Sequence, residues 1–146
     1  MSAIAIEANS HVLVVDDLED DVFLLMRALR KGGLTNPIDS LENGSLAVEH
    51  LKEGMNNGPG CKLPALVLLD IKMPVMDGHQ VLAWIRAQPP LKDLPVYVLA
   101  SSDLPEDLSR AQSSAASGYW VKPSSSQDFN DLVAKVKNAL HQRPAM

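Results

Sequence analysis

Three short runs of apolar residues divide the chain, and none of them alternates with polar positions. These runs lie at 12–15, 66–69 and 96–99. A strand that is apolar at every position is typical of the centre of a parallel sheet, because helices cover both of its faces. Weaker runs at 37–41 and 118–121 indicate two further strands. The pattern therefore predicts a five-stranded sheet with buried central strands.

Segments with helical periodicity lie between these runs. Four of them carry apolar residues at helical spacing, at 22–29, 46–51, 81–85 and 129–140. Acidic residues at 19–21 precede the first, as suits a helix N-terminus. A fifth segment, 106–116, is helical by position, but Leu108 is its one large apolar residue, so we expect it to pack most loosely. Strands that alternate with helices predict one α/β domain of five β-α units.

Length, charge and cysteine content narrow the class of protein. The chain has 146 residues and a formal charge of -5, and its basic residues are scattered, which argues against binding to nucleic acid. No apolar run approaches the roughly 20 residues that span a bilayer. The single cysteine, Cys61, offers no disulfide framework. We expect a cytoplasmic protein with a lead-in at 1–10, one domain at 11–142, a tail at 143–146 and no output domain.

Reactive side chains follow four of the five predicted strands. They are Asp16 and Asp17 after the first, Asp70 after the third, Ser101 after the fourth and Lys122 after the fifth. In an open parallel sheet, ligands bind beyond the carboxyl ends of the strands, so we expect these groups to converge on one edge. Each has a plainer explanation when taken alone, since Asp16 and Asp17 would also suit a helix cap. The four together favour a functional site.

The chemistry of this set favours phosphoryl transfer. Clustered carboxylates repel one another unless a cation neutralises them, and oxygen ligands suit Mg²⁺. A carboxylate forms an acyl phosphate when a metal ion and an ammonium group offset the charge of the incoming phosphoryl group. Lys122 would provide that ammonium group, and Ser101 a hydroxyl donor. The sequence therefore predicts a magnesium-dependent phosphorylation site at Asp70.

Four motifs resemble those of bacterial two-component response-regulator receiver domains. They are VVDD at 14–17, LLDIKMPVMDG at 68–78, VLASS at 98–102 and GYWVKP at 118–123. The resemblance extends over about 12–140. It implies a flavodoxin-like receiver fold, which is a five-stranded parallel sheet of order 2-1-3-4-5 with five helices on both faces.

The resemblance also implies a role for each residue of the metal pocket. Asp70 would be the phosphoacceptor. Asp17, with help from Asp16, would hold Mg²⁺ together with Asp70. The backbone carbonyl of Lys72 would complete the protein ligands. The long side chain of Lys72 points a cation toward the mouth of the pocket, where it would alter how water reaches the acyl phosphate.

Further residues would carry the signal away from the pocket. Ser101, where Thr is frequent in the family, and Lys122 would contact the phosphoryl group. Tyr119 would be the aromatic residue whose rotamer follows Ser101 as the switch turns. Trp120 is unusually large for its position, and we expect it to fill the core or to pack on a helix or a partner.

The resemblance implies a histidine kinase as the phosphoryl donor. The long loop at 54–64, DDLEDDVFLLMRAL at 16–29 and RAQPPLKDLPVYVLASS at 86–102 look like small stand-alone regulators paired with phytochrome-type kinases. The expected output is a changed contact, with a separate effector or a second copy, through the face of the fourth helix, fifth strand and fifth helix. The domain would assist its own phosphotransfer and dephosphorylation without being an enzyme.

Three other readings of the same residues are weaker. An aspartate-dependent phosphatase usually has a second Asp two residues after its nucleophile, and Lys72 stands there. A receiver-like module that no longer accepts phosphate would be expected to lack pocket residues, and all are present. A flavin-binding domain would need a phosphate loop after the first strand, where Asp16 and Asp17 would repel the phosphate.

Overall fold

The five predicted strands form a single parallel sheet. The computed structural model describes residues 11–56, 63–100, 109, 113 and 115–141. The strands are β1 (Val12–Val15), β2 (Ile38–Leu41), β3 (Leu66–Asp70), β4 (Val96–Ala100) and β5 (Gly118–Val121). Their order in the sheet is β2-β1-β3-β4-β5, and every neighbouring pair is parallel. The predicted fold class and strand order are confirmed.

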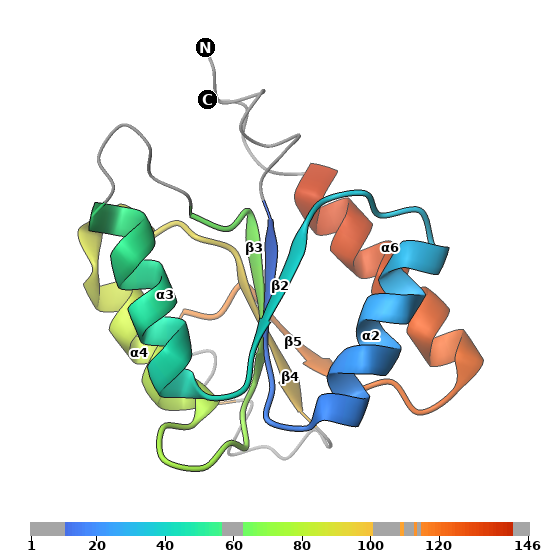
Figure 1. The fold of residues 1–146 in the computed structure, drawn as a ribbon, viewed down its shortest axis with the longest axis horizontal. Helices are drawn as coiled ribbons and strands as arrows, with labels where there is room; N and C mark the ends of the chain where they lie inside the picture. Colours follow the sequence, from blue (N-terminus) through green and yellow to red (C-terminus); the bar gives the residue numbers. More distant parts are fainter. Residues whose placement is uncertain (1–10, 57–62, 101–108, 110–112, 114, 142–146) are drawn as a thin grey trace.

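Helices cover both faces of this sheet. The structure describes α2 (Glu19–Lys31), α3 (Gly44–Asn56), α4 (Gly78–Ala87) and α6 (Ser126–His141), with a short 3₁₀ helix η2 (Pro89–Leu91). Figure 1 shows α3 and α4 on one face and α2 and α6 on the other. The prediction of a helix at 106–116 lies mostly outside the described residues. Among the helices that are described, none is long and apolar enough to cross a membrane.

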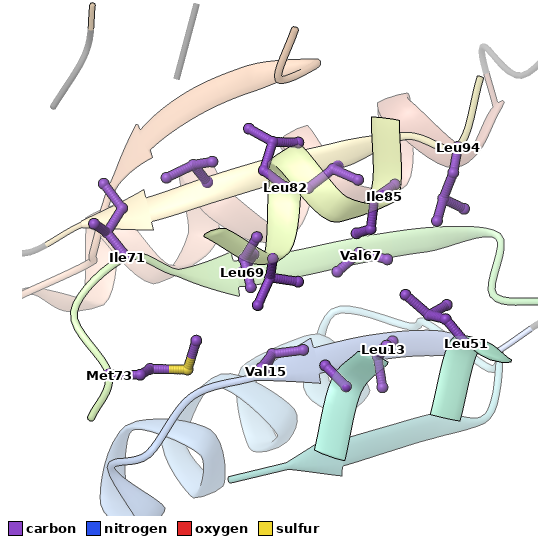
Figure 2. Packing of buried hydrophobic residues seen from close by; sticks show 14 of the residues in the cluster. Leu13, Val15, Leu51, Val67, Leu69, Ile71, Met73, Leu82, Ile85 and Leu94 are labelled. Carbon is purple, nitrogen blue, oxygen red and sulfur yellow. The ribbon is translucent and has the colours of Figure 1, made fainter. Parts of the chain in front are cut away.

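The central strands are buried because each of their two faces meets a separate hydrophobic core. Leu13 and Leu69 face the cluster under α3 and α4, which Figure 2 shows from close by. Their neighbours Val14 and Leu68 face the cluster under α2 and α6. Successive side chains of a strand point to opposite faces, so burial on both sides requires an unbroken apolar run. This is the physical reason for the pattern in the sequence.

Trp120 fills space beside the second core cluster. Its ring stacks on Tyr97 of the neighbouring strand, with the ring centroids 4.2 Å apart and the planes 17° from parallel. The ammonium group of Lys135 on α6 lies 5.6 Å from the centre of the Trp120 ring. Stacked aromatic pairs and a cation above an aromatic face both stabilise such an arrangement. Trp120 is therefore partly buried and packs both against the second core cluster and beside α6, which fits two of the expected roles.

Candidate functional site

Three carboxylates meet at the edge of the sheet where the strands end. We call it the carboxyl-terminal edge. Asp16, Asp17 and Asp70 each bring one oxygen to within 4.8 Å of the others. The register of β1 and β3 explains this, because Val15 pairs with Leu69 and the next residues are Asp16 and Asp70. Asp16 is 7% exposed and Asp70 4% exposed. The structure thus brings together the three carboxylates that the sequence predicted.

The local backbone fixes the carboxylate of Asp16. The backbone N–H of Asp16 donates to the carbonyl of Leu41 at 3.1 Å, which extends the pairing of β1 with β2. One side-chain oxygen of Asp16, Oδ1, accepts from the backbone N–H of Leu18 at 2.9 Å. This short loop from an Asp side chain to the chain two residues on is a favourable Asx turn. It orients Asp16 while the chain turns into α2.

A glycine at the start of α4 holds the end of β3 in place. The backbone N–H of Gly78 donates to the carbonyl of Ile71 at 2.8 Å. A Cβ atom on Gly78 would lie 2.4 Å from the carbonyl oxygen of Asp70 and 2.7 Å from the Cα of Ile71. Only glycine allows the backbones to approach so closely. The DG pair that follows Asp70 in the sequence therefore positions Asp70 itself.

The loop between Asp70 and α4 contains one strained residue. Val75 has a φ of 69°, and its side chain is 91% exposed. The backbone N–H of Met76 donates to the carbonyl of Pro74 at 2.7 Å, so Val75 is the centre of a tight three-residue turn. A positive φ is unfavourable for a residue branched at Cβ. The strained residue therefore lies in the segment that connects Asp70 to α4.

Lys122 lies among the carboxylates, as the sequence predicted. Its backbone N–H donates to the carbonyl of Ala100 at 2.7 Å, which places it at the end of β5. Its Nζ lies 2.9 Å from Oδ2 of Asp16 and 3.0 Å from Oδ2 of Asp21. The distance from Nζ to Oδ2 of Asp70 is 3.5 Å. The ammonium group is therefore shared by three carboxylates and is closest to two of them.

Asp21 is a pocket residue that sequence reasoning missed. In the sequence it is one of several acidic residues that suit a helix N-terminus, and α2 does begin with Glu19, Asp20 and Asp21. However, Asp21 lies in the first turn of the helix that follows β1, and its Oδ2 is 3.0 Å from Nζ of Lys122. The local sequence carries no signal of this contact, because Lys122 lies 101 positions away and only the folded chain brings the two side chains together.

The pocket holds more negative charge than one lysine can balance. Burial raises the pKa of Asp70 to about 7, and the charge of Asp16 adds to the effect, while Lys122 and the backbone N–H of Lys72 oppose it. Burial alone would lower the pKa of Lys122, but hydrogen bonds to Asp16 and Asp21 and the charge of Asp70 raise it. Such a site favours a cation. Its oxygen-only donors suit a hard divalent ion.

Of the remaining predicted site residues, the structure describes Tyr119 and Lys72 but not Ser101. Ser101 lies outside the described residues, so its position stays a prediction. Tyr119 lies on β5, pairs in register with Val98 and packs against the first core cluster. The side chain of Lys72 is exposed, and its backbone N–H donates to the carboxylate of Asp70. The role of its carbonyl as a metal ligand stays a prediction.

Comparisons with known proteins agree with this geometry. The family model described as "Response regulator receiver domain" matches residues 12–137. The probable methanogenesis regulatory protein FilR2 of Methanothrix harundinacea is 37% identical over 126 residues, which are 86% of this chain and 80% of that protein.

Two solved structures share the fold over most of both chains. The phosphorylated cyanobacterial phytochrome response regulator RcpA has a TM-score of 0.80 and 25% identity, over 92% of this chain and 95% of that one. The Mn²⁺-bound form of response regulator Rcp1 has a TM-score of 0.76 and 26% identity, over 92% of this chain and 97% of that one.

Proposed function

This chain belongs to the response regulator receiver domain family, and on that premise we propose that Asp70 accepts a phosphoryl group from a histidine kinase. The observation that carries the proposal is the position of Asp70, which is buried at the end of β3 between two other carboxylates and 3.5 Å from the ammonium group of Lys122. Residues 11–142 would form the receiver domain.

We propose that Mg²⁺ occupies the acidic pocket during phosphorylation. The donor set supports this, because Asp16, Asp17 and Asp70 offer carboxylate oxygens within 4.8 Å of one another. Burial raises the pKa of Asp70, and the charge of Asp16 raises it further; a cation in the pocket would neutralise that second effect. The backbone carbonyl of Lys72 would add a further oxygen ligand. When bound, the ion would supply positive charge for the oxygens of the transferring phosphoryl group.

The chain's own residues would perform the transfer as a displacement at phosphorus. A carboxylate oxygen of Asp70 attacks the phosphorus of a phosphohistidine. The bond between phosphorus and nitrogen breaks, and the imidazole leaves with the electron pair. The ammonium group of Lys122, already held beside Asp70, stabilises the negative charge on the phosphoryl oxygens. Asp70 must be ionised to attack, so the reaction requires loss of the proton that burial favours.

Phosphorylation would then change a protein contact. The product carries additional negative charge and acceptor oxygens. Ser101 would move toward the phosphoryl group, and Tyr119 would follow it. Tyr119 lies on β5, which is an edge strand with Val121 half exposed. A shift in the population of the face that includes β5 would favour a separate effector or a second copy of the chain.

The source of the signal can also be proposed. One neighbour by structure is a phosphorylated phytochrome response regulator, which supports a phytochrome-type histidine kinase as the donor for this chain. Kinases of this kind transfer phosphate inside the cell, so we place the protein in the cytoplasm. Phosphorylation-independent binding and phosphatase activity are the alternatives that the following experiment separates from phosphoryl acceptance.

The test uses acetyl phosphate as a small phosphoryl donor. The protein is incubated with acetyl phosphate and MgCl₂, and its intact mass is measured. We expect the wild type to gain one phosphoryl group, Asp70→Asn to gain none and Asp93→Asn, which removes an exposed carboxylate elsewhere, to behave as the wild type. An unmodified wild type, or equal gain in Asp70→Asn, would refute the proposal. Steady release of phosphate at many turnovers would favour a phosphatase.

A further inference from the structure

A second cluster of metal-binding side chains lies at the opposite edge of the sheet, where the strands begin. His11 Nε2 is 3.1 Å from Nε2 of His50 and 3.7 Å from Oδ2 of Asp39. One donor atom from each of the three residues lies within 4.8 Å of the other two. The chain has four histidines, and two of them meet here although 39 positions separate them. Nothing in the receiver chemistry described above uses this cluster.

The fold brings these three residues together through rigid elements. His11 directly precedes β1, and its carbonyl accepts from the backbone N–H of Ala65 at 2.8 Å. Asp39 on β2 pairs in register with Leu13 on β1. Residues in register on neighbouring strands, and residues two apart on one strand, point to the same face. His11 and Asp39 therefore share the face on which Leu13 packs.

That face is the one covered by α3, which carries the third member of the cluster. Leu13 and Leu51 belong to the same hydrophobic core, and His50 is the residue before Leu51. His11 and His50 are partly buried, whereas Asp39 is exposed. The cluster is thus anchored by core packing on one side and open to solvent at Asp39. Such an arrangement is preorganised and still accessible to an ion.

The two imidazoles meet through their nitrogen atoms. The ring centroids are 5.3 Å apart, and the planes are nearly perpendicular at 84°. The two Nε2 atoms are 3.1 Å apart and would repel if both carried a proton, so at least one ring must have no proton on Nε2. Burial lowers the pKa of His11, and the charge of His50 lowers it further, against the opposing effect of Asp39. Neutral imidazole is the form that binds metals.

We propose that His11, Asp39 and His50 form a binding site for a divalent transition-metal ion with the preferences of Zn²⁺. Two imidazole nitrogens and one carboxylate oxygen are a donor set that zinc takes, with a water in the fourth position. Two nitrogens that each lie about 2.05 Å from one tetrahedral ion are about 3.3 Å apart, close to the observed 3.1 Å. Mg²⁺ prefers oxygen ligands and would remain in the acidic pocket.

The alternative is a plain hydrogen bond between the two imidazoles. In that case one ring donates from Nε2 and the other accepts, and no ion is needed. The two cases differ in a measurable way, because a hydrogen-bonded pair gives no stoichiometric metal uptake. An ion at this site would tie the start of β1, β2 and the middle of α3 together. It would therefore stabilise the folded chain by an amount that grows with the logarithm of the ion concentration divided by Kd.

Zinc binding to the full chain tests the proposal. Isothermal titration with ZnCl₂ is carried out in a large excess of Mg²⁺, so that the acidic pocket is already occupied. We expect one Zn²⁺ per chain, an affinity at least tenfold weaker in His50→Gln and in Asp39→Asn, and a rise in melting temperature on adding Zn²⁺ to the wild type alone. Glu49→Gln, which removes an exposed charge beside His50, should bind as the wild type does.

Two further measurements separate loss of the site from loss of the fold. Without zinc, His50→Gln should melt as the wild type does and should still be phosphorylated by acetyl phosphate. In the wild type, Zn²⁺ should shift the ¹⁵N resonances of Nε2 in two histidines, which requires no variant. The proposal is wrong if the wild type binds no stoichiometric zinc, if His50→Gln keeps full affinity, or if the Nε2 resonances do not move.

Discussion

The two edges of the sheet each gather three side chains that can bind a cation, but they differ in donor atoms, burial and charge. At the carboxyl-terminal edge the donors are three carboxylates, two of them buried, with an ammonium group 2.9 Å from Asp16. At the amino-terminal edge the donors are two imidazoles and one exposed carboxylate. The first edge is built from strand ends and loops, and the second from strand beginnings and α3.

The donor set at each edge, rather than the fold, decides the chemistry. The same sheet presents hard oxygen ligands at one edge and nitrogen ligands at the other, and these favour different metals. Only the carboxyl-terminal cluster combines a buried carboxylate nucleophile with a fixed ammonium group. A phosphoryl group needs both, because its charge must be offset while the carboxylate attacks.

The largest expected effect comes from removing the ammonium group. In Lys122→Met, the rate of phosphorylation of Asp70 by acetyl phosphate should fall by about 100-fold or more at saturating Mg²⁺, because no fixed positive charge then faces the phosphoryl oxygens. The measurement is the rate of mass gain. Lys135→Met removes an ammonium group from α6 beside Trp120 and should leave the rate unchanged. Equal rates in Lys122→Met and the wild type would make the carboxyl-terminal edge a metal site only.

A second prediction compares buried and exposed carboxylates in protein kept free of metal by EDTA. The pKa of Asp70 is raised from 3.8 to about 7 in the folded chain. A raised pKa gives stability that is present below pH 4 and is lost as pH rises through 7. Asp70→Asn abolishes this loss, so its free energy of unfolding should increasingly exceed that of the wild type as pH rises from 4 to 7.

The expected gain in Asp70→Asn above pH 7 is at most the ~4 kcal/mol that corresponds to a change in pKa from 3.8 to about 7, and that change already includes the opposing charge of Lys122. Urea denaturation at pH 4 and pH 8 measures it. Asp39→Asn, at the exposed carboxylate of the amino-terminal edge, should change the free energy of unfolding by less than ~0.5 kcal/mol. A pH-independent difference for Asp70→Asn would mean that Asp70 is not desolvated.

The sequence was sufficient for the sheet and for most of the carboxyl-terminal edge. An unbroken apolar run such as Leu66 to Leu69 can bury both of its faces only at the centre of a parallel sheet. The residue that follows the run must then lie at the carboxyl-terminal edge. That is why Asp70 could be placed from its neighbours alone. The start of α4 follows from a local signal in the same way, because Asp77 caps this helix and forms a reciprocal pair of hydrogen bonds with Gln80.

The parts that the sequence did not predict depend on contacts between distant elements. Asp21 has the local sequence of a helix-terminal acid, and its contact with Lys122 depends on how α2 packs against α6, the helix that follows Lys122. His11 and His50 carry no common motif, and only the docking of α3 on the start of β1 brings them together. The strain at Val75 was equally hidden, because a backbone angle follows from the closure of the whole loop.

Relief of that strain gives the smallest expected effect. Val75→Gly should raise the free energy of unfolding by about 0.5 to 1 kcal/mol, since the left-handed conformation costs a residue with a Cβ roughly 1 to 2 kcal/mol and glycine gives back part of this as unfolded-state entropy. The side chain is 91% exposed, so no packing is lost. Val75→Ala is the matched control, because it keeps the Cβ and should gain less. Urea denaturation distinguishes the two. Destabilisation by glycine would mean that the valine side chain holds the loop over Asp70, and the rate of phosphorylation in the same variant would then fall with it.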